Sequence, residues 1–242
     1  MTTLLVLHEY GDERAAAGWQ PLVDGWLARG GEPGAELARG GEPGAELARR
    51  GEPGGEAGRA LALDLPGHGH TPLPEGGKLV PSDLQLFAVR ALRDAGVAEP
   101  PVVVGHGWGG FAAELLAAAG RAAAVVLVDG LGGPWVSQEE LGLLNAQWLR
   151  GVFEDPAADS APAGGLDPLV RHGFVSVWER EFTEARRAAV TVPVLALETP
   201  QSPTPRAERD ERLAAFGGEV ECEEIAAPAA EAVAAALSRR SW

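Results

Sequence analysis

Six short apolar runs, separated by stretches long enough for helices, constrain the fold of this chain more than any other feature. The runs are "TLLVL" (3–7), "ALAL" (60–63), "PVVV" (101–104), "AAVVLV" (123–128), "VPVLAL" (192–197) and "EVECEEI" (219–225). Strands that are buried on both faces of a parallel sheet read as continuous apolar runs, and their alternation with helices is typical of βαβ units. The sequence therefore predicts an α/β fold with about six mostly parallel strands flanked by helices.

Two segments interrupt this alternation. The unit "GGEPGAELAR" occurs at 30–39 and again at 40–49, and a diverged copy, "RGEPGGEAGR", follows at 50–59. Because ten residues with proline and several glycines cannot complete a stable helix, we expect a polar tandem-repeat loop over 30–59. Residues 130–190 are longer than one crossover helix requires, and their helical spacing predicts a small helical lid. The predicted domains are a core of 1–129 and 191–242 and a lid of 130–190.

Charge and composition exclude several classes of partner. The chain has 242 residues and a formal net charge of −15, which repels phosphate backbones and anionic lipid surfaces. The first apolar run is also too short for a signal peptide or a membrane span. The single cysteine, Cys222, suits a reducing compartment. We therefore expect a cytoplasmic protein without nucleic-acid or membrane partners, whose oligomeric state these features leave open.

The segment "VVVGHGWGG" at 102–110 carries the strongest functional signal. An apolar run that stops at Gly-His-x-Trp-Gly predicts a strand that turns sharply into a helix, the setting in which hydrolases present a nucleophile at x. Here x is Gly107, which has no side chain with which to attack.

Several motifs together resemble the α/β-hydrolase fold family over nearly the whole chain. They are "LLVLHEYG" followed by Trp19, "LALDLPGHGHT" (61–71), "VVGHGWGG" and the short helix after the last strand. The resemblance implies that fold, a Ser or Asp nucleophile at position 107, and oxyanion-hole N–H donors at Tyr10 and Trp108. Glu9 stands where the family usually has glycine, and a carboxylate there would oppose an oxyanion. Glu9 and His8 are predicted to lie at the pocket entrance.

The rest of the triad that the resemblance implies is also missing from its usual positions. No Asp follows the fifth predicted strand, where Glu198 and, further on, Glu208 are the only carboxylates near at hand. No histidine follows His172, although the family's general base normally comes just before the final helix. Asp129, His172 and Glu198 are the remaining catalytic candidates.

The histidines do not indicate a metal site. His68 and His70 belong to a turn, His106 matches a structural position of the family, and no His/Cys/Asp cluster has ligand spacing. The spacing Gly-x-Gly-x-Gly-Gly also differs from the dinucleotide-binding pattern, so we expect neither a metal nor an organic cofactor.

The favoured interpretation is a protein that is a hydrolase by ancestry, with little or no serine-hydrolase activity and a retained pocket for a small apolar or acyl-like molecule. Two alternatives stay open. One is a non-covalent enzyme of the same fold, of the hydrolase, lyase or cyclase type, that uses a rebuilt site. The other is a protein-interaction module, which predicts an exposed apolar patch.

Overall fold

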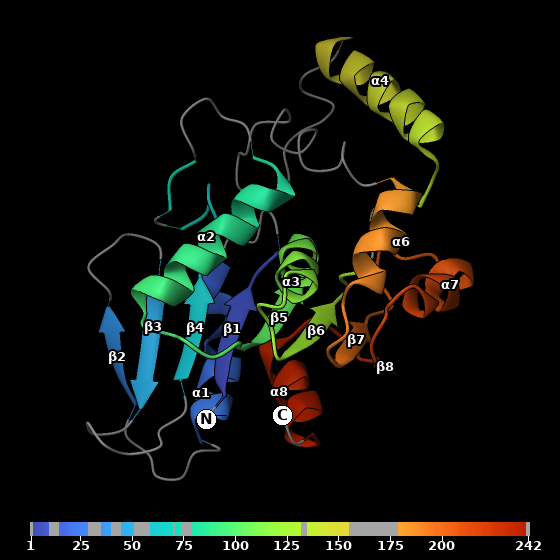
Figure 1. Cartoon of the computed structure of the whole chain (residues 1–242). Coiled ribbons are helices and arrows are strands. Elements are labelled where there is room, and N and C mark those ends of the chain that lie inside the picture. Colours follow the sequence, from blue (N-terminus) through green and yellow to red (C-terminus); the bar gives the residue numbers. More distant parts are fainter. Residues whose placement is uncertain are drawn as a thin grey trace.

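An eight-stranded sheet in the order β2-β3-β4-β1-β5-β6-β7-β8 forms the centre of the molecule (Figure 1). The computed structural model describes residues 2–9, 15–28, 35–39, 45–50, 59–69, 71–73, 79–131, 135–154 and 179–240. Six strands run parallel: β4 (Arg59–Leu63), β1 (Thr3–Leu7), β5 (Val102–His106), β6 (Ala124–Val128), β7 (Val194–Glu198) and β8 (Val220–Glu224). Each contains most of one predicted apolar run, so the prediction of about six mostly parallel strands is confirmed.

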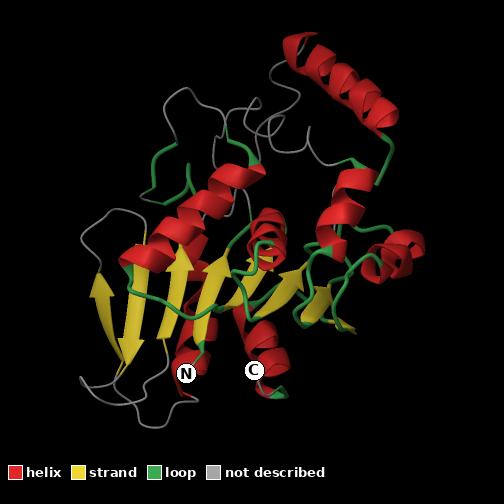
Figure 2. Cartoon of the chain, viewed as in Figure 1, coloured by secondary structure: helices red, strands yellow, loops and turns green. Residues whose placement is uncertain are grey.

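Helices cover both faces of the sheet (Figure 2). The 3-10 helix η1 (Ala15–Trp19) leads into α1 (Gln20–Ala28), which packs with α8 (Ala230–Ser238) on one face. On the other face α2 (Pro81–Asp94) packs with α3 (Trp108–Ala118), and α6 (Arg180–Ala188) packs against α3. The strands supply both apolar cores by alternation: Leu5 and Leu7 of β1 belong to the α3 side, and Leu4 and Val6 to the α1 side.

The repeat segment differs from the predicted loop. The structure has two strands there, β2 (Ala35–Arg39) and β3 (Ala45–Arg50), both formed by the "AELAR" part of a repeat unit. They pair antiparallel with each other, and β3 pairs antiparallel with β4. The sequence argument excluded only a helix, whereas five residues suffice for a strand whose backbone groups find partners along the edge of β4.

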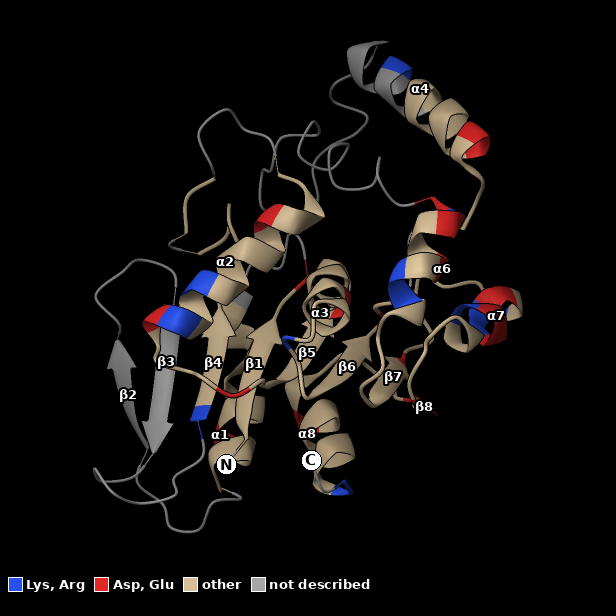
Figure 3. Cartoon of the chain, in the orientation of Figure 1, with Lys and Arg blue, Asp and Glu red and all other residues tan. Residues whose placement is uncertain are grey.

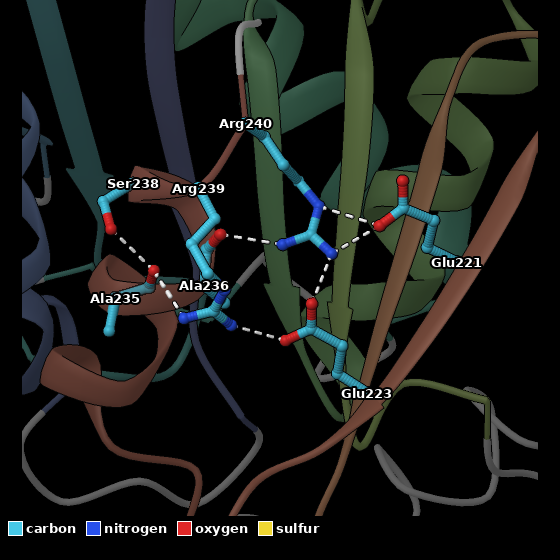
Figure 4. Close-up of polar contacts among 7 residues, drawn as sticks. All are labelled: Glu221, Glu223, Ala235, Ala236, Ser238, Arg239 and Arg240. Atoms are coloured by element: carbon cyan, nitrogen blue, oxygen red, sulfur yellow. Dashed lines mark hydrogen bonds and ion pairs between the residues drawn. The ribbon is translucent and has the colours of Figure 1, made fainter.

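Ion pairs join the edge strand β8 to the two residues that follow the C-terminal helix α8 (Figure 4). Arg240 reaches both Glu221, through Nε at 3.1 Å, and Glu223, at 2.5 Å. Arg239 also binds Glu223, at 2.6 Å. Cys222, predicted as a strand residue, lies between these two glutamates. Charged side chains on an edge strand discourage its pairing with a second chain.

The predicted lid segment contains two helices in its described part, α4 (Gln138–Glu154) and α6. Because α6 packs against α3, this end of the segment belongs to the layer that covers the core. Helix α4 lies beyond α6, away from the sheet (Figure 1). No helix in the described residues is both long and apolar enough to cross a membrane. Residues 155–178, and with them His172, lie outside the described part of the chain.

Candidate functional site

The turn between β5 and α3 has the geometry that the sequence predicts. Gly107 lies between them with φ +47° and ψ −108°, a backbone conformation that residues other than glycine rarely adopt. Its neighbours must be small as well, because a Cβ on Gly105 would lie 2.5 Å from the carbonyl oxygen of Gly109. The chain therefore keeps the sharp strand-to-helix turn at the carboxyl ends of the parallel strands.

The carboxylate of Glu9 fills the space where a side chain at position 107 would lie. A Cβ on Gly107 would stand 1.2 Å from Glu9 Oε2, far inside contact distance. Glu9 follows β1, which pairs with β5, and the register of Leu7 with Gly105 brings positions 9 and 107 side by side. The Trp108 N–H donates a hydrogen bond to Glu9 Oε1 at 3.2 Å.

The position of the Glu9 carboxylate also favours a negative charge. Trp108 is the first residue of α3, so the carboxylate lies at the positive end of an eleven-residue helix. The Trp108 N–H is one of the two oxyanion-hole donors predicted from the sequence, and in this structure it binds the carboxylate of the protein itself. Tyr10, the other predicted donor, lies outside the described residues.

His8 supports the turn from inside the protein. Its side chain is fully buried, its Nε2 accepts a hydrogen bond from the Leu65 N–H at 3.0 Å, and its Nδ1 lies 2.7 Å from the Glu9 carbonyl oxygen. Because the first contact requires Nε2 as acceptor, Nδ1 carries the proton and donates it to the carbonyl. The ring also meets His68 edge-on, with ring centres 4.7 Å apart. His8 therefore links the end of β1 to the turn after β4.

Asp129 links the ends of β6 and β7. It is buried with φ +48°, and its two oxygens accept hydrogen bonds from the backbone N–H and the hydroxyl of Thr199, each at 2.7 Å. Within the described residues, neither oxygen meets a histidine. This arrangement gives Asp129 a structural role in holding the two strand ends together.

Glu198, the last residue of β7, is fully buried. Its Oε2 accepts a hydrogen bond from the Ser202 hydroxyl, and its Oε1 has no partner among the described residues. Burial raises the pKa of this carboxyl, the Ser202 hydrogen bond opposes the rise, and the nearby charge of Asp129 adds to it. The net pKa lies above its ordinary value of 4.5.

The Glu198→Gln variant is expected to be more stable than the wild type at neutral pH. In the unfolded chain this carboxyl ionises near pH 4.5, while the folded chain keeps the proton to a higher pH. The favourable contribution of Glu198 is thus complete below pH 4.5 and is lost as the pH rises through the folded pKa.

Urea unfolding of the wild type and of Glu198→Gln, measured at about every pH unit between pH 4 and 8, tests this prediction. Glu139→Gln, which changes an exposed glutamate of α4, is the control. A stability difference between wild type and Glu198→Gln that does not grow with pH would contradict the assignment.

An apolar cavity of about 690 Å³ opens between α2, α3, α4 and α6. Val80, Pro81, Leu115, Leu141 and Phe182 supply its apolar walls. Its few polar groups come from Ser82, Gln138, Asn145 and Glu179. A mostly apolar hollow with a few polar groups is typical of small-molecule sites.

The aromatic residue at the start of the insertion has a different environment. Trp135 lies among the guanidinium groups of Arg180, Arg187 and Arg212, at 5.4, 5.6 and 5.0 Å from its ring centre. Its Nε1 donates to Glu211 at 3.2 Å. Figure 3 shows charged residues gathered on α6 and on α7 (Arg209–Ala214). Trp135 therefore anchors the start of this segment and does not line the apolar cavity.

Two other residues from the sequence, Glu208 and His106, have contacts of a different kind. Glu208, at the end of η2 (Arg206–Glu208), binds Arg212 at 2.6 Å, and His106 meets Trp19 edge-on at 5.7 Å. His70 lies outside the described residues. In the described part of the chain, no group of three or more His, Cys, Asp or Glu side chains is arranged to hold a metal ion.

Sequence reasoning missed a buried ion cluster behind the site. Glu114 of α3 binds Arg186 and Arg187 of α6, and all three side chains are nearly or completely buried. The available signal was a charged residue inside the apolar helical run "FAAELLAAA".

Comparisons with known proteins agree with this architecture. The profile of the family described as "Alpha/beta hydrolase family" matches residues 25–240. Among solved structures, the enol-lactonase from Burkholderia xenovorans LB400 has a TM-score of 0.61 at 17% identity, covering 98% of this chain and 88% of its own. A thioesterase domain from the curacin biosynthetic pathway has a TM-score of 0.65 at 13% identity, covering 99% and 91%. A hydrolase from Pseudomonas aeruginosa PA01 has a TM-score of 0.58 at 15% identity, covering 92% and 81%. At these identities the likeness shows the fold. No curated protein matches the sequence.

Proposed function

This chain belongs to the alpha/beta hydrolase family, and from that premise we propose that it has lost the family's covalent mechanism and retains a binding site for a small apolar or acyl-like molecule. The observation that carries the proposal is the position of the Glu9 carboxylate, which fills the space of the missing nucleophile and accepts the Trp108 N–H.

Three features support the loss of covalent chemistry. Gly107 offers no attacking atom, and the carboxylate beside it places negative charge where an oxyanion would form. Both oxygens of Asp129 accept hydrogen bonds from Thr199, and in the described part of the site neither orients an imidazole. The segment "IAAPA" at 225–229, where the family's base is expected, contains no histidine. A triad needs all three groups in contact, because nucleophile, base and acid act as one unit.

Binding is assigned to the apolar cavity between α2, α3, α4 and α6. Its walls offer the burial that an acyl chain requires, since each buried methylene contributes about 0.8 kcal/mol. The names of two relatives, a thioesterase and an enol-lactonase, refer to acyl and lactone chemistry. Short linear alcohols, their methyl esters and lactones are therefore suitable probes.

A cavity-filling variant tests the binding site. Gly142 of α4 lines the cavity, and a Cβ there would meet nothing within 4 Å, so a side chain at this position can start into the cavity and Gly142→Phe is chosen to occupy it. We expect the alcohols and esters to raise the thermal unfolding temperature of the wild type and to lose this effect in Gly142→Phe. Leu143→Phe, at a neighbouring exposed position of the same helix, is the matched control and should behave as the wild type.

Two outcomes would contradict this proposal. Turnover of an ester, lactone or epoxide that is lost in Asp129→Asn would favour a rebuilt active site. Equal thermal shifts in wild type and Gly142→Phe, or none in either, would remove the cavity from the proposal.

The Gly107→Ser variant is expected to show no burst of acyl-enzyme with p-nitrophenyl acetate. No histidine stands at the family's usual base position to take the proton of a serine hydroxyl here, and the serine Cβ would collide with the Glu9 carboxylate. The measurement is stopped-flow release of p-nitrophenolate by the folded variant. A burst equal to the enzyme concentration that the wild type does not show would mean that a side chain of this protein, a histidine or the Glu9 carboxylate, takes the serine proton.

A further inference from the structure

A second, polar cavity of about 630 Å³ lies at the carboxyl ends of β7 and β8. Its lining includes Glu198, Ser202, Thr204, Arg206, Arg209 and Glu224. These residues come from the two strand ends and from the segment that leads through η2 into α7. None of them lines the apolar cavity described above, so the two hollows are distinct.

Three of the lining residues each carry a buried polar atom that has no hydrogen-bond partner in the described part of the protein. These atoms are Oε1 of Glu198, the hydroxyl of Thr204 and Nε of Arg209. The side chain of Glu198 is completely buried and that of Thr204 is 4% exposed. Buried polar groups are nearly always paired, and three that share one cavity point to a bound group that completes them.

The hydrogen-bonding types of these atoms define the missing partner. The Arg209 Nε–H is a donor, and Glu198 Oε1 accepts when the carboxyl is ionised. The Thr204 hydroxyl can both donate and accept. A ligand that satisfies all three must carry donors and acceptors close together, which hydroxyl groups supply.

The charges around the cavity are balanced. Arg206 and Arg209 both bind Glu224, at 2.5 and 3.1 Å, and Glu198 supplies the second carboxyl. Among the side chains that line the cavity, two guanidinium groups therefore face two carboxyls, so the lining itself has no formal excess of either charge. The neighbouring hydroxyl of Ser202 is already engaged, since it donates to Glu198 and accepts from the Thr204 N–H at 3.2 Å.

We propose that this cavity binds a small neutral polyhydroxyl compound, a polyol or a monosaccharide, through Glu198, Thr204 and Arg209. Such a ligand adds a binding site to the one proposed for apolar molecules and does not depend on it. Ordered water alone is the competing occupant, because water also offers both donors and acceptors.

Titration of the full-length chain with glycerol, xylitol and glucose, followed by protein NMR shifts, tests the proposal. We expect saturable binding of at least one compound to the wild type and at least about tenfold weaker binding to Thr204→Val, which removes one hydroxyl with little change of volume. Thr183→Val, at another buried threonine on α6, is the matched control and should bind as the wild type does.

Two further variants keep the outcome decisive. Arg209→Lys retains the charge but removes the Nε donor, so it should also weaken binding if Thr204→Val fails to fold. Gly142→Phe, which fills the apolar cavity, should leave polyol binding unchanged, so that failure of the first proposed site is distinguishable from failure of this one. Absence of saturable binding, or equal affinity in wild type, Thr204→Val and Arg209→Lys, would overturn the proposal and leave the cavity to water.

Discussion

Replacing Glu114 with alanine is expected to lower the free energy of unfolding by about 3–5 kcal/mol, the largest effect of any single substitution that we anticipate in this chain. Arg187 is fully buried and the Arg186 side chain is 4% exposed, so removal of their shared carboxylate leaves two guanidinium charges without compensation. Leaving a buried charge unpaired costs far more than the net stabilisation that the intact pair provides.

The geometry shows why Glu114 is the centre of this cluster. Its Oε2 accepts from Arg186 Nε at 2.9 Å, and its Oε1 accepts from Arg187 Nε and Nη2 at 3.1 and 2.9 Å. Arg187 also lies over the ring of Phe216, 5.0 Å from its centre. The cluster fixes α6 to α3, and therefore fixes one wall of the apolar cavity to the helix that begins at the elbow.

The cluster has a pH signature. Burial alone would raise the pKa of Glu114, but the charges and hydrogen bonds of Arg187 and Arg186 outweigh burial and hold the pKa below 4.5. A carboxyl whose folded pKa is depressed contributes stability above its unfolded pKa and loses it as the pH falls through the folded pKa. The difference in stability between wild type and Glu114→Ala should therefore shrink on the acid side of pH 4.5.

Urea unfolding followed by tryptophan fluorescence measures both effects. Glu184→Gln removes a half-exposed partner of Arg180 on the same helix and serves as the control, with an expected loss of about 0–1 kcal/mol. A loss below about 1 kcal/mol in Glu114→Ala would mean that the arginines find other partners, and the account of this cluster would be wrong.

The second large effect is expected at the elbow. Gly107→Ala should lower the free energy of unfolding by about 2–3 kcal/mol, from backbone strain at positive φ and from loss of the Glu9 hydrogen bond. The added Cβ would stand 1.2 Å from Glu9 Oε2, so the carboxylate must leave the helix N-terminus.

A double-mutant cycle separates these two causes. In the Glu9→Ala background, Gly107→Ala should cost only the backbone strain of about 1–2 kcal/mol, which gives a coupling of about 1 kcal/mol between the two positions. Gly142→Ala, a glycine in a helix with free space around it, should instead stabilise the chain by about 0.5–1 kcal/mol. Additive losses, to within about 0.5 kcal/mol, would place Glu9 away from the elbow.

Much of the fold could be predicted because its signal is local. The runs that became β1, β5 and β6 are buried on both faces, and such strands are apolar without interruption. The sharp turn at Gly107 could also be predicted, because the positive φ at Gly107 and the close approach of Gly105 to Gly109 are local requirements for glycine.

The missed features depend on partners that are distant in sequence. The "AELAR" units have no apolar run, and they became strands because β4 offers an open edge to β3. Glu9 and Trp108 are 99 positions apart, and Glu114 and Arg186 are 72 apart, so neither contact leaves a local pattern. The sequence indicated that Glu9 would disturb an oxyanion hole, but only the pairing of β1 with β5 places its carboxylate against the elbow.

The central claim is that Glu9 has replaced the nucleophile as occupant of the elbow without taking over its chemistry. The most direct test mixes the wild-type protein with excess p-nitrophenyl acetate and follows p-nitrophenolate release in the first turnover, together with the intact protein mass. We predict no burst and no acyl adduct on the segments that contain Glu9 and Gly107. A burst equal to the enzyme concentration that disappears in Glu9→Ala would show that the carboxylate itself attacks the substrate, and it would contradict the claim.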